Sequence, residues 1–418
     1  MKLFRNLLDK VKPNFTEGGK LEKFYPVYDS IETFLFVPGH ETTKGAHIRD
    51  GIDMKRTMFM VIIAMTPCLL FGMWNIGHQH FLAMGEMVAL GDGLWDKFFY
   101  GLLKILPVII VSYGVGLGAE FAFCIIKKHS INEGFLVSGM LIPLIMPVET
   151  PLWMVAVATL FAVVIGKEVF GGTGMNILNV ALTARAFLFF AYPTMMSGDK
   201  VWTALDGQAP VDGYSGATAM GNAALTIDLN KKIDQANVAG DIEVANQLQG
   251  QMDATLAKIP AFYDLFMGWI PGSMGETSAL MCLIGAAILL FTGIGSWRVM
   301  LSTLIGGITM AWIFNLAGAN PFMEIPIASQ LAMGGFMFGM VFMATDPVTA
   351  AQTNTGKYIY GFFIGLFAIM IRVFNPAYPE GMMLAILFMN VMAPMIDHYV
   401  IAANIKRRAK RAVQLQAA

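Results

Sequence analysis

The sequence predicts an all-α integral membrane protein with about ten transmembrane helices in two inverted five-helix halves, some of the helices short or broken. Three observations support this fold class. The chain of 418 residues is 56% hydrophobic and only 14% charged, which is more apolar and less charged than a soluble domain. Its apolar residues gather in segments near the length of a bilayer crossing. Its lysines and arginines gather in alternate connections between those segments.

Ten apolar segments account for the predicted membrane helices. Most approach the roughly 20 residues needed to cross a bilayer, whereas two are shorter, with about 14, and are expected to be tilted, broken or re-entrant. These two are 135–148 and 331–344. The full set is 57–76, 99–126, 135–148, 152–166, 177–193, 277–295, 299–317, 331–344, 358–374 and 382–402.

The polar flanks and connections predict the topology. Residues 1–56 lack an apolar signal sequence and form a predicted cytoplasmic arm, and the tail 403–418 is strongly basic. The connections 318–330 and 375–381 carry no lysine or arginine. The positive-inside rule therefore places both termini in the cytoplasm. The basic residues that the ten-span topology assigns to cytoplasmic connections are Lys127, Lys128, Lys167, Arg298 and Lys357.

The ten segments divide into a first half, 57–193, and a second half, 277–402. Because each half has an odd number of segments, the second would be inserted with the opposite orientation, and ligand sites are expected where such halves meet. A weak internal echo supports a repeat, since Gly134-Phe135 recurs as Gly335-Phe336 and 164–172 resembles 370–376. Chance similarity between apolar segments is the alternative.

A polar insert, 194–276, separates the halves and is predicted to lie outside the cytoplasm. Apolar residues four apart within it predict a short amphipathic helix. These are Val244, Leu248, Met252 and Leu256. The insert also contains Asp212-Gly213-Tyr214-Ser215-Gly216-Ala217-Thr218, which by composition alone is typical of an ordinary turn.

Six motifs together resemble the B subunits of the bacterial sodium-translocating NADH:quinone oxidoreductases. The related D subunit of the Rnf ferredoxin:NAD complexes is less similar because it lacks the long arm, and residues 222–258 are longer and more polar than the family pattern. The motifs are residues 212–218, 167–174, 185–193, 271–276, 344–348 and 375–383. Membership would imply a bacterial inner-membrane redox protein that acts with further subunits.

The resemblance implies two flavins. FMN would be esterified through its phosphate to Thr218, within Ser215-Gly216-Ala217-Thr218, by a separate flavin transferase. Non-covalent riboflavin would lie near Asn176 and Asn179, beside the glycines of 171–174, where amides can satisfy the edge of the flavin ring. The structural alternative is a glycine-rich break between helices with capping asparagines.

The resemblance also associates Gly116, Glu120 and the arm residues Tyr25–Phe36 with ubiquinone or menaquinone. A flat apolar headgroup needs small residues for access and aromatic rings for stacking. The alternative is that Gly116, with Gly118, forms a close helix contact.

Carboxylates within apolar segments are candidates for a Na⁺ route, because a hard cation prefers oxygen ligands. Glu120, Asp346 and Asp397 are the candidates, although each could lie at a wet helix end, and Asp346 before Pro347 could serve as a cap. Arg185, within an apolar segment, is expected to pair with an internal acceptor.

Other classes of site receive little support. Cys68, Cys124 and Cys282 lie in apolar segments and form no metal motif, and a net charge of −1 gives no indication of nucleic-acid binding. His78 and His80 are expected in a loop outside the cytoplasm, and their spacing does not suit two haem ligands on one helix. A passive channel is the alternative of another class, but it has no use for the Thr218 motif.

Overall fold

The computed structural model describes residues 2–16, 18–36, 42–48, 51–127, 135–197, 201–375 and 380–417, and within these ranges it contains helices and no β-strand. Six helices are long and apolar enough to cross a membrane. They are α3, α4, α6 with the turn that follows it, α13, α16 and α17. The all-α prediction is therefore confirmed, whereas the count of ten spans and the inversion of the halves stay predictions.

The arm contains two helices and two short 3₁₀ turns. These are α1 (Lys2–Val11), η1 (Lys12–Asn14), η2 (Glu22–Phe24) and α2 (Tyr25–Leu35). Tyr28 joins the helices, because its hydroxyl donates to the Leu8 carbonyl at 3.2 Å. Burial and the neighbouring Glu32 carboxylate raise the pKa of Tyr28 to about 12. The ring of Phe34 meets Phe59, so the arm lies against the beginning of α3.

The first half contains five helices that match the five predicted segments. They are α3 (Met54–Ala83), α4 (Leu94–Lys127), α5 (Phe135–Leu144), α6 (Leu152–Gly166) and α7 (Val180–Ala191), with the turn η3 (Glu168–Phe170) after α6. The prediction of an outside loop at His78 and His80 is wrong, because both are buried in the last turns of α3. The imidazole Nδ1 of His80 lies 2.6 Å from the Ala204 carbonyl, a contact that holds this polar end of the helix.

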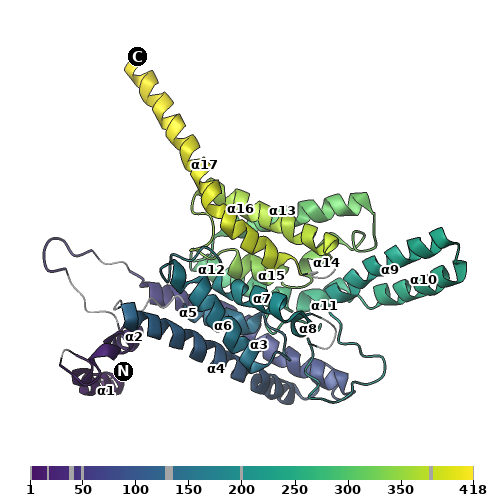
Figure 1. The fold of residues 1–418 in the computed structure, drawn as a ribbon, viewed down its shortest axis with the longest axis horizontal. Coiled ribbons are helices and arrows are strands. Elements are labelled where there is room, and N and C mark those ends of the chain that lie inside the picture. The colour runs from purple at the N-terminus through teal and green to yellow at the C-terminus, as the bar shows by residue number, and fades with distance from the viewer. Residues whose placement is uncertain are drawn as a thin grey trace.

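The insert is largely helical. It contains α8 (Pro193–Met196), α9 (Ala219–Ala239), α10 (Ile242–Ala257) and α11 (Phe262–Met267). The predicted amphipathic helix is α10. It packs on α9 through a small apolar cluster in which Leu229, Ile233 and Met252 are buried. This hairpin of α9 and α10 projects from the bundle, away from the ends that carry the two chain termini (Figure 1).

The second half mixes long helices with a broken segment. Its elements are α12 (Ala279–Phe291), α13 (Trp297–Ala317), α14 (Ile327–Ala332), α15 (Phe336–Phe338), the π-helical turn η4 (Gly339–Met343), α16 (Asn354–Phe374) and α17 (Met382–Ala417). The segment predicted at 331–344 is therefore in pieces, and Gly334 takes a positive φ of 61° between two of them. Helix α17 continues into the basic tail, where residues 403–411 are exposed (Figure 1).

Local sequence explains many helix ends. Ser278 and Thr353 begin α12 and α16, and each side chain accepts a hydrogen bond from a backbone N–H of the first turn. Gly240, Gly268 and Gly318 end α9, α11 and α13 in the left-handed conformation that glycine adopts most readily. One hydrophobic core then joins the two halves, with Cys68 of α3 and Cys282 of α12 buried side by side, their sulfurs 3.9 Å apart.

Candidate functional site

Thr218 is the N-cap of α9. Its Oγ1 accepts a hydrogen bond from the Gly221 N–H at 3.0 Å, and its backbone is extended. Gly213 and Gly216, just before it, have φ values of 90° and 67°, which explains glycine at both places. Ser215 accepts a bond from the Ala217 N–H at 3.4 Å. The motif is thus a glycine-shaped turn that ends at the amino end of a 21-residue helix.

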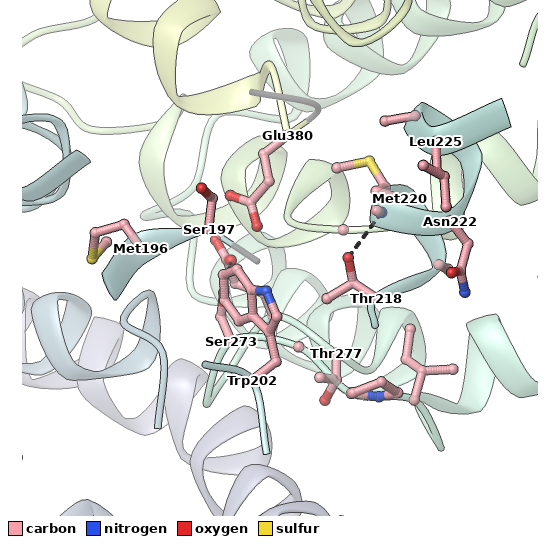
Figure 2. Close-up of a pocket in the computed structure, with 18 of the residues that line it drawn as sticks. Met196, Ser197, Trp202, Thr218, Met220, Asn222, Leu225, Ser273, Thr277 and Glu380 are labelled. Atoms are coloured by element: carbon pink, nitrogen blue, oxygen red, sulfur yellow. Dashed lines mark hydrogen bonds between the residues drawn. The ribbon is translucent and has the colours of Figure 1, made fainter. Parts of the chain in front are cut away.

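Thr218 lines a cavity of about 330 Å³ at the junction of the insert and the second half. Figure 2 shows Trp202, Ser273 and Glu380 around the same space as Thr218. This volume lies within the roughly 300–1,000 Å³ typical of small-molecule sites. An aromatic ring, hydroxyls and a carboxylate suit a flat heterocycle with both donors and acceptors, such as an isoalloxazine.

A buried charge cluster forms the inner wall of this cavity. Arg185 of α7 donates to Glu276 Oε2 at 2.9 Å and forms a second ion pair with Glu380. Ser273 also donates to Glu276 Oε2, at 2.6 Å. The internal acceptor expected for Arg185 is therefore confirmed. Because α7 belongs to the first half and Glu380 precedes α17, the cluster ties the two halves together.

Hydrogen bonds from α3 and α4 hold the turn that leads to Thr218. The Tyr214 hydroxyl lies 3.0 Å from Thr203 Oγ1 and 3.2 Å from Gln79 Oε1, and burial raises the pKa of Tyr214. The Tyr100 hydroxyl donates to Asp206, which also pairs with Lys104. Of these supporting residues only Tyr214 belongs to a motif, 212–218, and sequence analysis did not identify the others.

A second cavity lies between the halves and contains both asparagines that sequence analysis associated with riboflavin. Asn176 and Asn179 line it together with Asp346, Lys167 and Thr173. The amide of Asn179 donates to Asp346 Oδ2 at 3.2 Å. The enclosed space is about 90 Å³, so a tricyclic ring would enter only after wall side chains shift.

The asparagines of the second cavity also have structural roles. Asn179 caps α7, accepting from the Leu182 N–H at 3.2 Å, and Asn176 donates to the Leu178 carbonyl at 3.0 Å. Gly171, Gly172 and Gly174 all have positive φ, so the glycine-rich break between α6 and α7 requires them. The capping alternative is therefore confirmed for Asn179 but not for Asn176, and it coexists with the cavity.

Gly116 and Glu120 lie on the buried face of α4. A Cβ atom at Gly116 would fall on the Phe135 ring, so this glycine permits close contact between α4 and α5. Glu120 forms an ion pair with Lys167, with both side chains under 5% exposed. Lys167 lies in the turn between α6 and η3, as the sequence predicts, but it is buried in this ion pair. The arm helix α2 contacts α4 as well.

The three carboxylates proposed for Na⁺ are not brought into one cluster. Asp346 accepts from the Val348 N–H at 3.0 Å and from Thr349 Oγ1 at 3.1 Å, so it stabilises the turn after Ala344. Asp397 accepts from the N–H groups of Gln352 and Thr353 at 2.6 and 3.0 Å, just before α16. In the described residues, no group of three His, Cys, Asp or Glu could hold a metal ion.

Comparison with known proteins adds a full-length relationship. The model of the NQR2, RnfD, RnfE family matches residues 41–406. The chain is 48% identical to the B subunit of the Na(+)-translocating NADH-quinone reductase of Ectopseudomonas mendocina, over 98% of this chain and 99% of the relative. It is 46% identical to the proteins of the same name from Pseudomonas paraeruginosa, over 97% and 99%, and Stutzerimonas stutzeri, over 98% and 99%.

Proposed function

Because the chain belongs to the NQR2, RnfD, RnfE family, we propose that it is the flavin-bearing membrane subunit of a sodium-translocating NADH:quinone oxidoreductase. In this role it passes electrons through covalent FMN and riboflavin toward ubiquinone or menaquinone, coupled to Na⁺ export. For its organisation we propose an arm of residues 1–56, two halves of 57–193 and 277–402, an insert of 194–276 and a tail of 403–418.

The position of Thr218 carries the proposal. Its hydroxyl caps a helix and lines the 330 Å³ cavity, so an FMN esterified there would have its phosphate beside the free N–H groups of the first turn. Helix amino ends favour phosphate through these donors and the helix dipole. Trp202 and Glu380 would then contact or orient the ring, which supplies electron transfer when bound.

The second cavity is the proposed riboflavin site, with Asn176 and Asn179 providing amide contacts. Its walls come from both halves, and the short segment 135–148 and the broken segment 331–344 each contribute residues, Leu141 and Phe342. Interrupted segments at corresponding positions of two halves are the pattern of inverted-repeat proteins, in which ligands bind between the repeats. This placement supports the two inverted five-helix halves.

Quinone binding is assigned to the region around Gly116 and Glu120 of α4 and around the arm helix α2, which contacts α4. Glu120, Asp346 and Asp397 remain the proposed contributors to the Na⁺ route. Asp346 lines the riboflavin cavity, whereas Asp397 lines neither cavity. NADH oxidation is assigned to partner subunits, and a separate flavin transferase is required for attachment.

The covalent flavin is tested by intact-mass measurement of the purified chain. One FMN adduct is expected on the wild-type chain and none on Thr218→Ala. Thr218→Ser keeps both the hydroxyl and the cap and controls for the fold. An adduct that survives in Thr218→Ala would contradict the assignment.

The proposed topology has both termini in the cytoplasm and the insert on the other side of a bacterial inner membrane. A cysteine at the exposed Asn237 of α9 is expected to react with an impermeant thiol reagent in intact cells, whereas one at exposed Lys20 in the arm should react only after lysis. The three native cysteines are buried and give a low background. The reverse labelling pattern would place the covalent flavin on the cytoplasmic side.

A further inference from the structure

Lys167 occupies two environments at once. Its ammonium pairs with Glu120 of α4, and its side chain lines the cavity that also contains Asn176, Asn179 and Asp346. It stands at the end of α6, where the following residues form η3. A single cation therefore lies between the proposed riboflavin cavity and the carboxylate associated with quinone and Na⁺.

The Glu120 carboxylate is only partly satisfied by this pair. Its Oε1 atom contacts Lys167, but its Oε2 atom is buried and accepts no hydrogen bond from any described residue. Buried carboxylate oxygens are normally hydrogen-bonded, and an unsatisfied one is a strong acceptor for a further donor or a cation. Glu120 thus has capacity for a second positive partner beyond Lys167.

The next acidic residue has a partner of its own. Glu168 lies 3.9 Å from the Lys127 ammonium, and its backbone carbonyl accepts from that ammonium at 3.2 Å. Lys127 is 40% exposed at its side chain and lines neither cavity, unlike Lys167 at 4%. Lys167 is therefore distinguished from its basic neighbour by burial and by access to the cavity, which makes Lys127 a matched control.

We propose that Lys167 is a shared cation that couples the charge of a flavin in the second cavity to cation binding at Glu120. With a neutral flavin, Lys167 neutralises Glu120. A flavin that carried a negative charge in the cavity would attract the Lys167 ammonium away from Glu120. Glu120, with its second oxygen already unpartnered, would then hold an uncompensated buried charge and would bind Na⁺ more tightly.

This assignment rests on the proposed function, because it takes riboflavin as the ligand of the second cavity. Its new content is the role of Lys167 as a positioning residue between the cavity and Glu120. A purely structural pair that joins α6 to α4 would stabilise the fold without influencing the flavin. The two roles differ in the reduction potential of the non-covalent flavin, which a cation at the cavity wall raises and a structural pair leaves unchanged.

The test uses the assembled complex and follows the midpoint potential of the non-covalent flavin by spectroelectrochemistry, with and without Na⁺. Lys167→Met is expected to disfavour the reduced flavin about tenfold, which corresponds to a fall of about 59 mV for one electron, and to remove the Na⁺ dependence. Glu120→Gln is expected to raise the potential, because Lys167 then has no competing carboxylate. Lys167→Arg should keep the Na⁺ dependence of the midpoint potential in the wild-type direction. Lys127→Met should leave the midpoint potential and its Na⁺ dependence unchanged.

If Lys167 is a shared cation, the midpoint potential of the non-covalent flavin shifts in opposite directions in Lys167→Met and Glu120→Gln. Unchanged potentials in both, or shifts in the same direction, would overturn the proposal. Loss of the non-covalent flavin from Lys167→Met alone, with the Thr218 adduct retained, would support Lys167 as a cavity residue, whereas equal loss from Glu120→Gln would reveal only a structural pair. If the wild-type complex yields no extractable riboflavin, the proposed function fails instead.

Discussion

Replacing Arg185 with methionine is expected to destabilise the protein by about 3–5 kcal/mol, the loss typical when one partner of a buried ion pair is removed. The substitution would leave Glu276 and Glu380 without their cation at the wall of the Thr218 cavity. It would also remove the polar link between the first and second halves. The expected result is a strongly lowered melting temperature and little chain in the membrane.

The melting temperature of the detergent-solubilised protein measures this effect. Arg56→Met is the matched control, because Arg56 pairs with Asp53 at the surface, with 42% of its side chain exposed, and such pairs contribute about 0–1 kcal/mol. Adding Glu276→Gln to Arg185→Met should recover part of the loss by removing one uncompensated charge. A melting temperature of Arg185→Met equal to that of Arg56→Met would contradict the role of the cluster.

Gly116→Leu is expected to have the second largest effect, because its side chain would overlap the Phe135 ring and force α4 and α5 apart. Overpacking of this kind costs about 1–3 kcal/mol. Gly118→Leu is the control on the same helix, since Gly118 is exposed and no atom lies within 4 Å of its Cβ position. The melting temperature should fall for Gly116→Leu only.

Gly116→Leu, together with Glu120→Gln, also tests the quinone and Na⁺ assignments. If the pocket borders Gly116, Gly116→Leu should raise the apparent KM for quinone or relieve inhibition by quinone analogues, while the Thr218 adduct remains complete. Glu120→Gln should instead weaken the Na⁺ dependence of turnover. Normal quinone kinetics and inhibitor sensitivity in a flavinylated Gly116→Leu complex would show that this glycine serves only the contact with Phe135.

Hydropathy predicts most of the helical architecture because membrane helices are recognisable by length and composition. Hydropathy does not predict the polar ends of these helices. The extension of α3 through His78 and His80 depends on tertiary partners, among them the Ala204 carbonyl, which lies more than 100 residues away in the sequence. Helix α9 is not predicted because its buried residues are mostly small or polar, such as Ala223 and Thr226, and show no strong apolar face.

The candidate site is predictable where a motif identifies it and not where only the fold assembles it. Thr218, Asn176 and Asn179 are found through family motifs, and each lines a cavity. The sequence predicts that Lys167 lies in a connection, which it does, but not that it is buried, since its pairing with Glu120 joins residues 47 apart in the chain. Trp202 belongs to no motif, and only its burial and its position in the lining of the Thr218 cavity identify it.

Thr218 lies at the end of the α9 and α10 hairpin that joins the main core, so it would move little if the hairpin tilted. Ala219 and Met220, the first residues of α9, are buried in the main core, whereas Ala239 and Gly240 at the far end are exposed. When a helical hairpin tilts about its buried end, the displacement of a residue grows with its distance from that end. If a neighbouring protein bound and tilted the end of the hairpin, that end would move furthest, and the Thr218 hydroxyl, the proposed attachment atom of FMN, would move least.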